Sequence, residues 1–207
     1  MVDNFFTIEG EETKEKEIVE KKSRFIAQII KITSEEEANK KILEIKRKHR
    51  DAKHNVFAYR IVNGIEKFSD DGEPSGTAGV PILDILRGEN LQNVLVVVTR
   101  YFGGILLGTG GLVRAYSSAT KEAILSSKKV EMKLCSEYEI VVEYGYYDIV
   151  NHYVQKNKIP IKKVEYDQKI CINIVLEKSK EKGILAEITE ITDRSAQISN
   201  IDTYYYT

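Results

Sequence analysis

The pattern of hydrophobic and polar positions divides the first part of the chain into strands and helices. A run of five apolar residues, 94–98, is flanked by polar positions and is rich in valine. Such a run predicts a strand buried on both faces. A glycine-rich segment follows it, and a helical pattern resumes from Leu112 to about Leu125. We therefore expect a strand, a glycine-rich loop and a helix in direct succession.

The preceding residues predict a helix between strands. Ser34 and Glu37 form a capping box, in which each side chain bonds a backbone N–H at the start of a helix. Apolar residues then recur at helical spacing. Strands are predicted over 2–10, 23–30 and 54–61, an exposed hairpin or loop over 11–22, a turn at Asn63-Gly64, an ordered loop over 68–81 and a short helix over 82–86.

The last third of the chain has a simpler pattern of strands and helices. Alternating apolar residues predict strands over 138–144, 161–166, 170–176 and 196–206. Helices are expected to begin near Asp148 and Ser179. The order βαββαβ is that of the ferredoxin-like sandwich. We expect an α+β protein with two domains, residues 1–130 and 131–207.

Charge excludes some classes of partner. The formal net charge is −1 over 207 residues, so the chain is not a polycation. Counting in the sequence gives +2 for residues 1–130 and −3 for residues 131–207, so nucleic-acid binding would need a local basic patch. The N-terminal residues lack the pattern of a signal peptide, and no apolar run is long enough to cross a membrane. The two cysteines, Cys135 and Cys171, are widely spaced and suit a reducing compartment, so we expect a cytoplasmic location.

The glycine-rich segment is a candidate anion site. A loop that leads into a helix N-terminus gathers backbone N–H groups and a partial positive charge, which suits a phosphate. The segment lacks the Gly-Lys-Ser/Thr of a P-loop, and Val113 replaces the third glycine of a dinucleotide fingerprint. Tight turns and close packing would also explain the glycines. The candidate residues are Arg100, Tyr101, Gly103, Gly104, Gly108, Gly110, Gly111, Arg114 and Lys121.

A second candidate set would support acid–base chemistry. If His54, Asp70, Asp71 and Glu73 converged near the glycine loop, they could act as acid and base. Their spacing does not match a zinc site or an EF-hand. The alternatives are loop capping for the two aspartates and a hydrogen-bonded, half-buried position for the histidine.

The remaining reactive residues carry weaker signals. His49 and His152 are expected to be solvated on helix faces, and both cysteines are expected to be inert thiols. The tyrosines 204–206 end the chain, and two of them on an open sheet face could stack on bases, although packing would also explain them.

Four segments together resemble the IMPACT/YigZ family. They are Tyr59-Arg60, Ser69–Gly79, which contains Asp70-Asp71-Gly72-Glu73-Pro74, Thr99–Gly104 and Leu107–Tyr116. The similarity covers about residues 15–128, and the rest is similar to the small domain of bacterial YigZ-type members. The resemblance implies a two-layer α/β domain of the ribosomal-protein and elongation-factor-G domain-four type. It also implies a ferredoxin-like domain similar to domain five of that factor.

The family leaves two kinds of function open. Eukaryotic relatives regulate translation through a protein that activates a stress kinase, but they carry an extra domain that this sequence lacks. We therefore expect a non-enzymatic, translation-associated protein that binds RNA, the ribosome or a translation-related protein, without a metal or cofactor. The alternative is a hydrolase or phosphoester enzyme that uses His54, Asp70, Asp71 and Glu73. A proline dipeptidase is not supported, because the sequence lacks a set of dinuclear metal ligands.

Overall fold

The chain folds as two compact units. The computed structural model describes residues 4–62 and 64–207. Unit 1 comprises Met1–Glu131 and unit 2 comprises Met132–Thr207. The predicted boundary after residue 130 lies one residue from this division.

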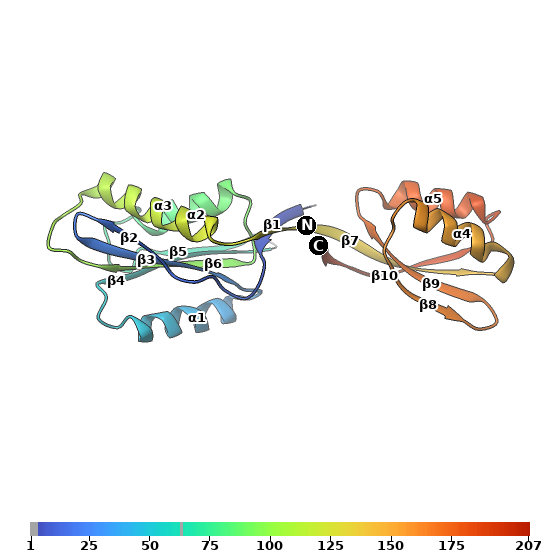
Figure 1. Cartoon of the computed structure of the whole chain (residues 1–207), viewed down its shortest axis with the longest axis horizontal. Helices are drawn as coiled ribbons and strands as arrows, with labels where there is room; N and C mark the ends of the chain where they lie inside the picture. Colours follow the sequence, from blue (N-terminus) through green and yellow to red (C-terminus); the bar gives the residue numbers. More distant parts are fainter. Residues whose placement is uncertain (1–3, 63) are drawn as a thin grey trace. The chain divides into compact units, whose positions relative to one another are not determined.

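Unit 1 is built around a five-stranded antiparallel sheet (Figure 1). Its strand order is β2-β3-β6-β4-β5. The strands are β2 (Lys16–Glu20), β3 (Ser23–Lys31), β6 (Val94–Tyr101), β4 (His54–Ile61) and β5 (Ile65–Ser69). β6 is central, and residues 94–100 are all buried. This confirms the prediction of a strand covered on both faces. A further strand, β1 (Asn4–Ile8), bonds through its Phe6 backbone to Asn90 and Gln92.

Helices cover both faces of this sheet. α1 (Glu35–Lys48) packs its Ile42 and Ile45 with Tyr59 and Leu95 on one face. α2 (Gly79–Gly88) and α3 (Thr109–Leu125) cover the other face, where the larger core forms (Figure 1). The α+β class is confirmed. α1 adds a third layer to the two-layer sandwich that the family resemblance implied.

Unit 2 has the ferredoxin-like order βαββαβ that the sequence predicted. Its elements are β7 (Lys129–Val142), α4 (Tyr144–Lys156), β8 (Ile161–Tyr166), β9 (Ile170–Glu177), α5 (Glu181–Ile191) and β10 (Gln197–Tyr206). The strands pair antiparallel in the order β10-β7-β9-β8. Ile140 and Ile172 of the sheet pack with Val150 and Ile188 of the helices.

Several element boundaries differ from the predictions for local reasons. β2 lies in the segment predicted as an exposed hairpin or loop, and β5 was not predicted, because most residues of both strands are exposed and show no buried alternation. α3 begins at Thr109, three residues before the predicted start, because two glycines of low helix propensity occupy its first turn. Asp148 lies inside α4 and does not cap it. Asn63 of the predicted turn lies outside the described residues. Within the described residues, each helix is too short or too polar to span a membrane.

Candidate functional site

The sheet register brings two of the predicted functional residues together. His54 at the start of β4 is the cross-strand partner of Arg100 near the end of β6, and Phe25 of β3 is the partner of Arg100 on the other side. Directly paired residues of antiparallel strands lie on the same face of a sheet. All three side chains therefore lie on the face that α2 and α3 cover.

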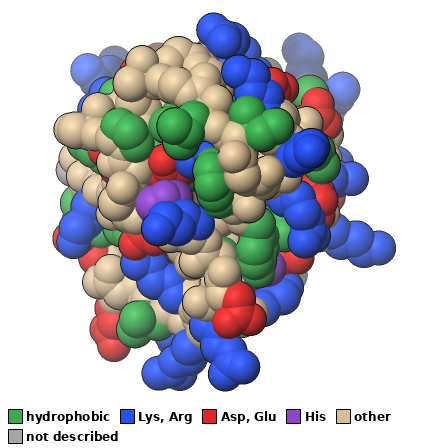
Figure 2. All heavy atoms as spheres, turned by 90° about the vertical axis from the view of Figure 1, so that its left-hand side faces the viewer, with side chains coloured by type: hydrophobic (Ala, Val, Ile, Leu, Met, Phe, Trp, Pro, Cys, Tyr) green, Lys and Arg blue, Asp and Glu red, His purple; other side chains and the backbone are tan. Residues whose placement is uncertain are grey.

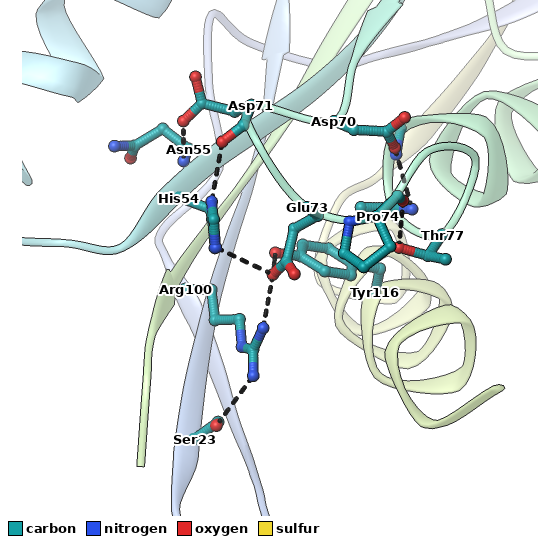
Figure 3. A network of polar contacts seen from close by, with 12 residues as sticks. Ser23, His54, Asn55, Asp70, Asp71, Glu73, Pro74, Thr77, Arg100 and Tyr116 are labelled. Atoms are coloured by element: carbon teal, nitrogen blue, oxygen red, sulfur yellow. Dashed lines mark hydrogen bonds and ion pairs between the residues drawn. The ribbon is translucent and has the colours of Figure 1, made fainter. Parts of the chain in front are cut away.

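The loop between β5 and α2 adds a carboxylate to this face. Asp70 fixes the loop, because its side chain accepts backbone N–H groups from Gly76 at 2.9 Å, Ala78 at 3.1 Å and Gly79 at 2.8 Å. The last two donors lie at the start of α2, which has no other side-chain cap. Residues 71 and 72 then turn through the left-handed region. The turn directs Glu73 toward the sheet (Figure 3).

Glu73 is the centre of a buried polar network (Figure 3). Its Oε1 accepts a hydrogen bond from Arg100 Nη1 at 2.7 Å and another from the Tyr116 hydroxyl at 2.7 Å. The exposed fractions of the Glu73 and Arg100 side chains are 3% and 6%. Burial, together with the negative charge of Glu73, raises the pKa of Tyr116 far above its ordinary value, so Tyr116 remains a hydrogen-bond donor. Arg100 thus balances the charge of Glu73, and Arg100 and Tyr116 both donate to its Oε1.

His54 lies at the edge of this network. Its Nδ1 lies 2.8 Å from the carbonyl oxygen of Asp71, which can only accept, so Nδ1 carries a proton. Its Nε2 then faces Glu73 Oε1 at 3.8 Å. This arrangement fixes the orientation of the imidazole ring.

Arg100 is held by aromatic rings as well as by Glu73. Its guanidinium carbon lies 5.4 Å from the ring centre of Phe25 and 5.6 Å from that of Phe102. Its Nη2 donates to Ser23 Oγ at 3.4 Å. Its buried Nε has no hydrogen-bond partner among the described residues. The Nε–H group of Arg100 is therefore buried without a hydrogen bond to a described residue.

A pocket of ≈ 450 Å³ opens beside this network. The polar residues that line it include Lys53, His54, Glu73 and Arg100. The apolar residues that line it are Pro74, Phe102, Leu106, Leu107 and Leu112. Gly108 and Thr109, at the start of α3, also line the pocket. Figure 2 looks onto this end of unit 1, where a histidine lies among basic and acidic side chains, hydrophobic side chains are exposed near it, and basic side chains rim the surface. Within the described residues, no group of three His, Cys, Asp or Glu side chains could hold a metal ion.

The cations predicted to form one anion site are dispersed. Arg100 is buried in the network. Arg114 is exposed and lines a separate hollow together with Lys21. Lys121 lies beside Lys129, where it lines a third hollow near the end of α3. The prediction that Arg100, Arg114 and Lys121 gather at one accessible point is therefore wrong.

Tyr101 lies on the opposite face of β6 from Arg100. Its hydroxyl bonds His49 Nδ1 at 3.0 Å, and His49 Nε2 lies 3.2 Å from Glu15. His49 is buried, so the prediction that it is solvated is wrong, because the end of α1 places it between Tyr101 of β6 and Glu15. His152 is exposed, as predicted.

Glycine occupies the positions of the candidate loop for different structural reasons. A Cβ at Gly103 would lie 2.0 Å from the backbone carbon of Lys22, so the two segments approach too closely for a side chain. Gly104 and Gly108 have φ of +82° and +74°, in the left-handed region. Gly111 is tight against Leu107, whereas a Cβ at Gly110 would meet only the Arg114 guanidinium at 3.6 Å. Close packing therefore explains part of this cluster, and Gly110 has no steric requirement.

The acid–base set converges only in part. His54 and Glu73 meet, but the Asp70 side chain caps α2, and the Asp71 side chain accepts from the Asn55 N–H and pairs with Lys46. The loop-capping interpretation is confirmed for Asp70, whereas the Asp71 side chain ties the loop to β4 and α1. At the other end of the chain, Tyr204 bonds Glu137 and contacts Lys162, so its ring is already engaged.

Sequence reasoning missed three participants. Tyr116 lies within a helix, and no local pattern links it to Glu73. Ser23 begins a strand, and Lys53 precedes one. No local pattern identified these three residues. The sequence did contain one signal for the site, the two-residue spacing of Arg100 and Phe102, which places both side chains on one face of an extended segment.

Comparisons with known proteins place the chain in a family. The model of the Impact N-terminal domain matches residues 21–124. The "IMPACT family member YvyE" of Bacillus subtilis is 36% identical over 207 residues, which cover 99% of this chain and 94% of that protein. The "IMPACT family member YigZ" of Escherichia coli is 32% identical over 188 residues, covering 88% and 91%.

A solved structure agrees with this assignment. It is titled "Crystal structure of an hypothetical protein", and it aligns with a TM-score of 0.62 and 28% identity over 98% of this chain and 99% of that one. Both the sequence and the fold therefore agree along nearly the whole length. The chain belongs to the IMPACT family.

Proposed function

We propose that this protein is a translation-associated, non-enzymatic binding protein that contacts the phosphates of RNA at one end of unit 1. The observation that carries the proposal is a group of three exposed cations beside the loop after β6. Lys21 and Lys22 form the turn between β2 and β3, and Arg114 lies in α3. None of the three makes an ion pair with another described residue. Cations without internal partners can exchange counterions for phosphates.

Two observations place these residues in one part of unit 1. Lys21 and Arg114 line one hollow, and the Lys22 backbone lies against Gly103. Phe102 and Ile105 of the adjoining loop are 47% and 42% exposed. Basic groups beside an exposed aromatic ring are the features with which proteins hold single-stranded RNA. Family membership supports the connection with translation.

The enzymatic alternative has less support. His54 and Glu73 lie close together, but Glu73 Oε1 already accepts from Arg100 and Tyr116. The Asp70 and Asp71 side chains are already engaged by the backbone N–H groups of Gly79 and Asn55. A carboxylate engaged in this way balances charge and is poorly placed to take a proton. Binding is therefore the function that the geometry supports better.

Reversing two of these charges is expected to abolish association with ribosomes. In co-sedimentation from lysate, the wild-type chain should travel with ribosomes and lose this association after ribonuclease digestion. The Lys21→Glu/Arg114→Glu variant should remain in the supernatant, because like charges repel the RNA backbone.

The matched control is Lys40→Glu/Lys121→Glu, which changes the net charge equally at exposed positions outside this group. It should sediment like the wild type. Equal loss for both variants would indicate a net-charge effect and would reject the proposed location. Sedimentation that survives ribonuclease would reject RNA as the partner.

A further inference from the structure

We propose that unit 2 carries a docking surface for an arginine-rich segment of a partner protein, formed by tyrosines at the start of α4 and in the β8–β9 hairpin. The tyrosine patch consists of Tyr144, Tyr147 and Tyr166. It lies in unit 2, whereas the cations proposed to contact RNA lie in unit 1, so each proposal can fail without the other.

The rings of the tyrosine patch are held in place but are not covered. The Tyr147 and Tyr166 hydroxyls lie 2.8 Å apart, and their ring centres lie 5.7 Å apart. The Tyr144 hydroxyl donates to the carbonyl oxygen of Asp167 at 2.8 Å. Tyr144 and Tyr166 nevertheless remain 55% and 60% exposed, so packing of the helix on the hairpin does not explain their rings. Aromatic rings held in this way lose little conformational entropy when a partner binds.

The charge around the tyrosine patch favours a cationic partner. Residues 143–148 and 163–169 contain four carboxylates and two cations. Both cations are already paired with two of the carboxylates. The other two carboxylates, Asp148 and Asp167, are exposed and have no ion pair with another described residue. Each directly follows a tyrosine of the patch, so the unpaired charge beside the rings is negative and repels the phosphates of a nucleic acid.

Arginine is the cation that can use both the rings and the carboxylates. Its planar guanidinium stacks on aromatic faces and bonds carboxylates through two nitrogens, whereas the ammonium of lysine is a compact, strongly hydrated charge. Unit 1 contains this combination within the chain. Arg24 donates to the Glu17 carboxylate at 2.9 and 2.8 Å, and its guanidinium carbon lies 5.4 Å from the ring centre of Tyr101. An uncharged apolar segment would cover the rings of the patch but would desolvate the aspartates without a counter-charge.

Removing the exposed rings is expected to weaken the binding of an arginine peptide. The probe is a fluorescently labelled peptide of alternating arginine and glycine, and its binding to the full chain is measured by fluorescence anisotropy. Tyr144→Leu/Tyr166→Leu should weaken binding by roughly tenfold, because leucine offers no π face to a guanidinium. Asp148→Asn/Asp167→Asn should weaken it by roughly threefold. The corresponding lysine peptide should bind the wild type more weakly than the arginine peptide does.

Tyr144→Phe/Tyr166→Phe is the matched control, because it loses the same hydroxyl hydrogen bonds as the leucine variant but keeps the rings. It should bind the arginine peptide like the wild type. The aspartate variant changes only exposed groups, so it tests the surface even if the leucine variant lowers stability. In two-dimensional NMR of the wild type, the peptide should shift the amides of Tyr147 and Asp167.

Four results would overturn the proposal. They are no binding of the arginine peptide, equal binding by the leucine and phenylalanine variants, equal binding of the arginine and lysine peptides, and unchanged binding by the aspartate variant. A single-stranded oligouridylate should leave the Tyr147 and Asp167 amides unshifted. Shifts caused by this RNA would assign the tyrosine patch to nucleic acid instead.

Discussion

Replacing Glu73 with alanine is expected to lower the free energy of unfolding of unit 1 by about 3–5 kcal/mol. The substitution leaves the guanidinium of Arg100 buried without its counter-charge and removes the acceptor of the Tyr116 hydroxyl. A buried pair contributes little compared with apolar residues, but breaking it by removing one partner is costly. Amide hydrogen exchange in β6 reports the unfolding of this unit separately from unit 2.

A double-mutant cycle distinguishes the broken pair from a simple cavity. Glu73→Gln combined with Arg100→Met removes both charges and keeps similar side-chain volumes. The double variant should be more stable than the sum of the two single changes predicts, by about 1–3 kcal/mol. Additive effects of the two substitutions would show that Glu73 and Arg100 do not act as a pair.

Gly103→Ala is expected to destabilise unit 1 by about 3 kcal/mol or more. A Cβ there would lie 2.0 Å from the backbone carbon and 2.1 Å from the carbonyl oxygen of Lys22. Backbone atoms cannot rotate away as a flexible side chain can, so the loop after β6 or the start of β3 must move. Ser23 Oγ, which accepts from the Gly103 N–H at 3.2 Å, would lose this bond. Urea unfolding of the full chain measures the loss.

Gly110→Ala is the matched control in the same loop–helix segment. A Cβ at Gly110 contacts only the end of the Arg114 side chain, and alanine has a higher helix propensity than glycine. This variant should be as stable as the wild type or more stable by up to about 1 kcal/mol. If both substitutions cost the same, the close approach of Gly103 to Lys22 is not the reason for the glycine.

The fold could be read from the sequence where burial leaves a strong pattern. β6 was predicted because its first five residues are all apolar, and unit 2 because its strands alternate and its helices have regular spacing. β2 and β5 carry mostly exposed residues, so their pairing depends on neighbours that are distant in the sequence. The covering of a second sheet face by α1 is likewise a property of the tertiary fold.

The candidate site could be read only in part, because charge does not reveal burial. Arg100 and Arg114 look alike in the sequence, yet one is buried against Glu73 and the other is exposed beside Lys21. Tyr116 joins the network through the packing of α3 on the sheet, which no local pattern encodes. In the glycine-rich segment, Gly103 is explained by packing, and Gly110 is left without a steric reason.

The salt dependence of RNA binding tests the central claim most directly. For a short single-stranded RNA, the logarithm of the binding constant should fall linearly with the logarithm of the salt concentration. Lys21→Glu/Arg114→Glu should weaken binding and reduce the slope by about 1.4, since each lost phosphate contact removes about 0.7. Lys40→Glu/Lys121→Glu should keep the wild-type slope. A slope that is the same for all three proteins would contradict the account.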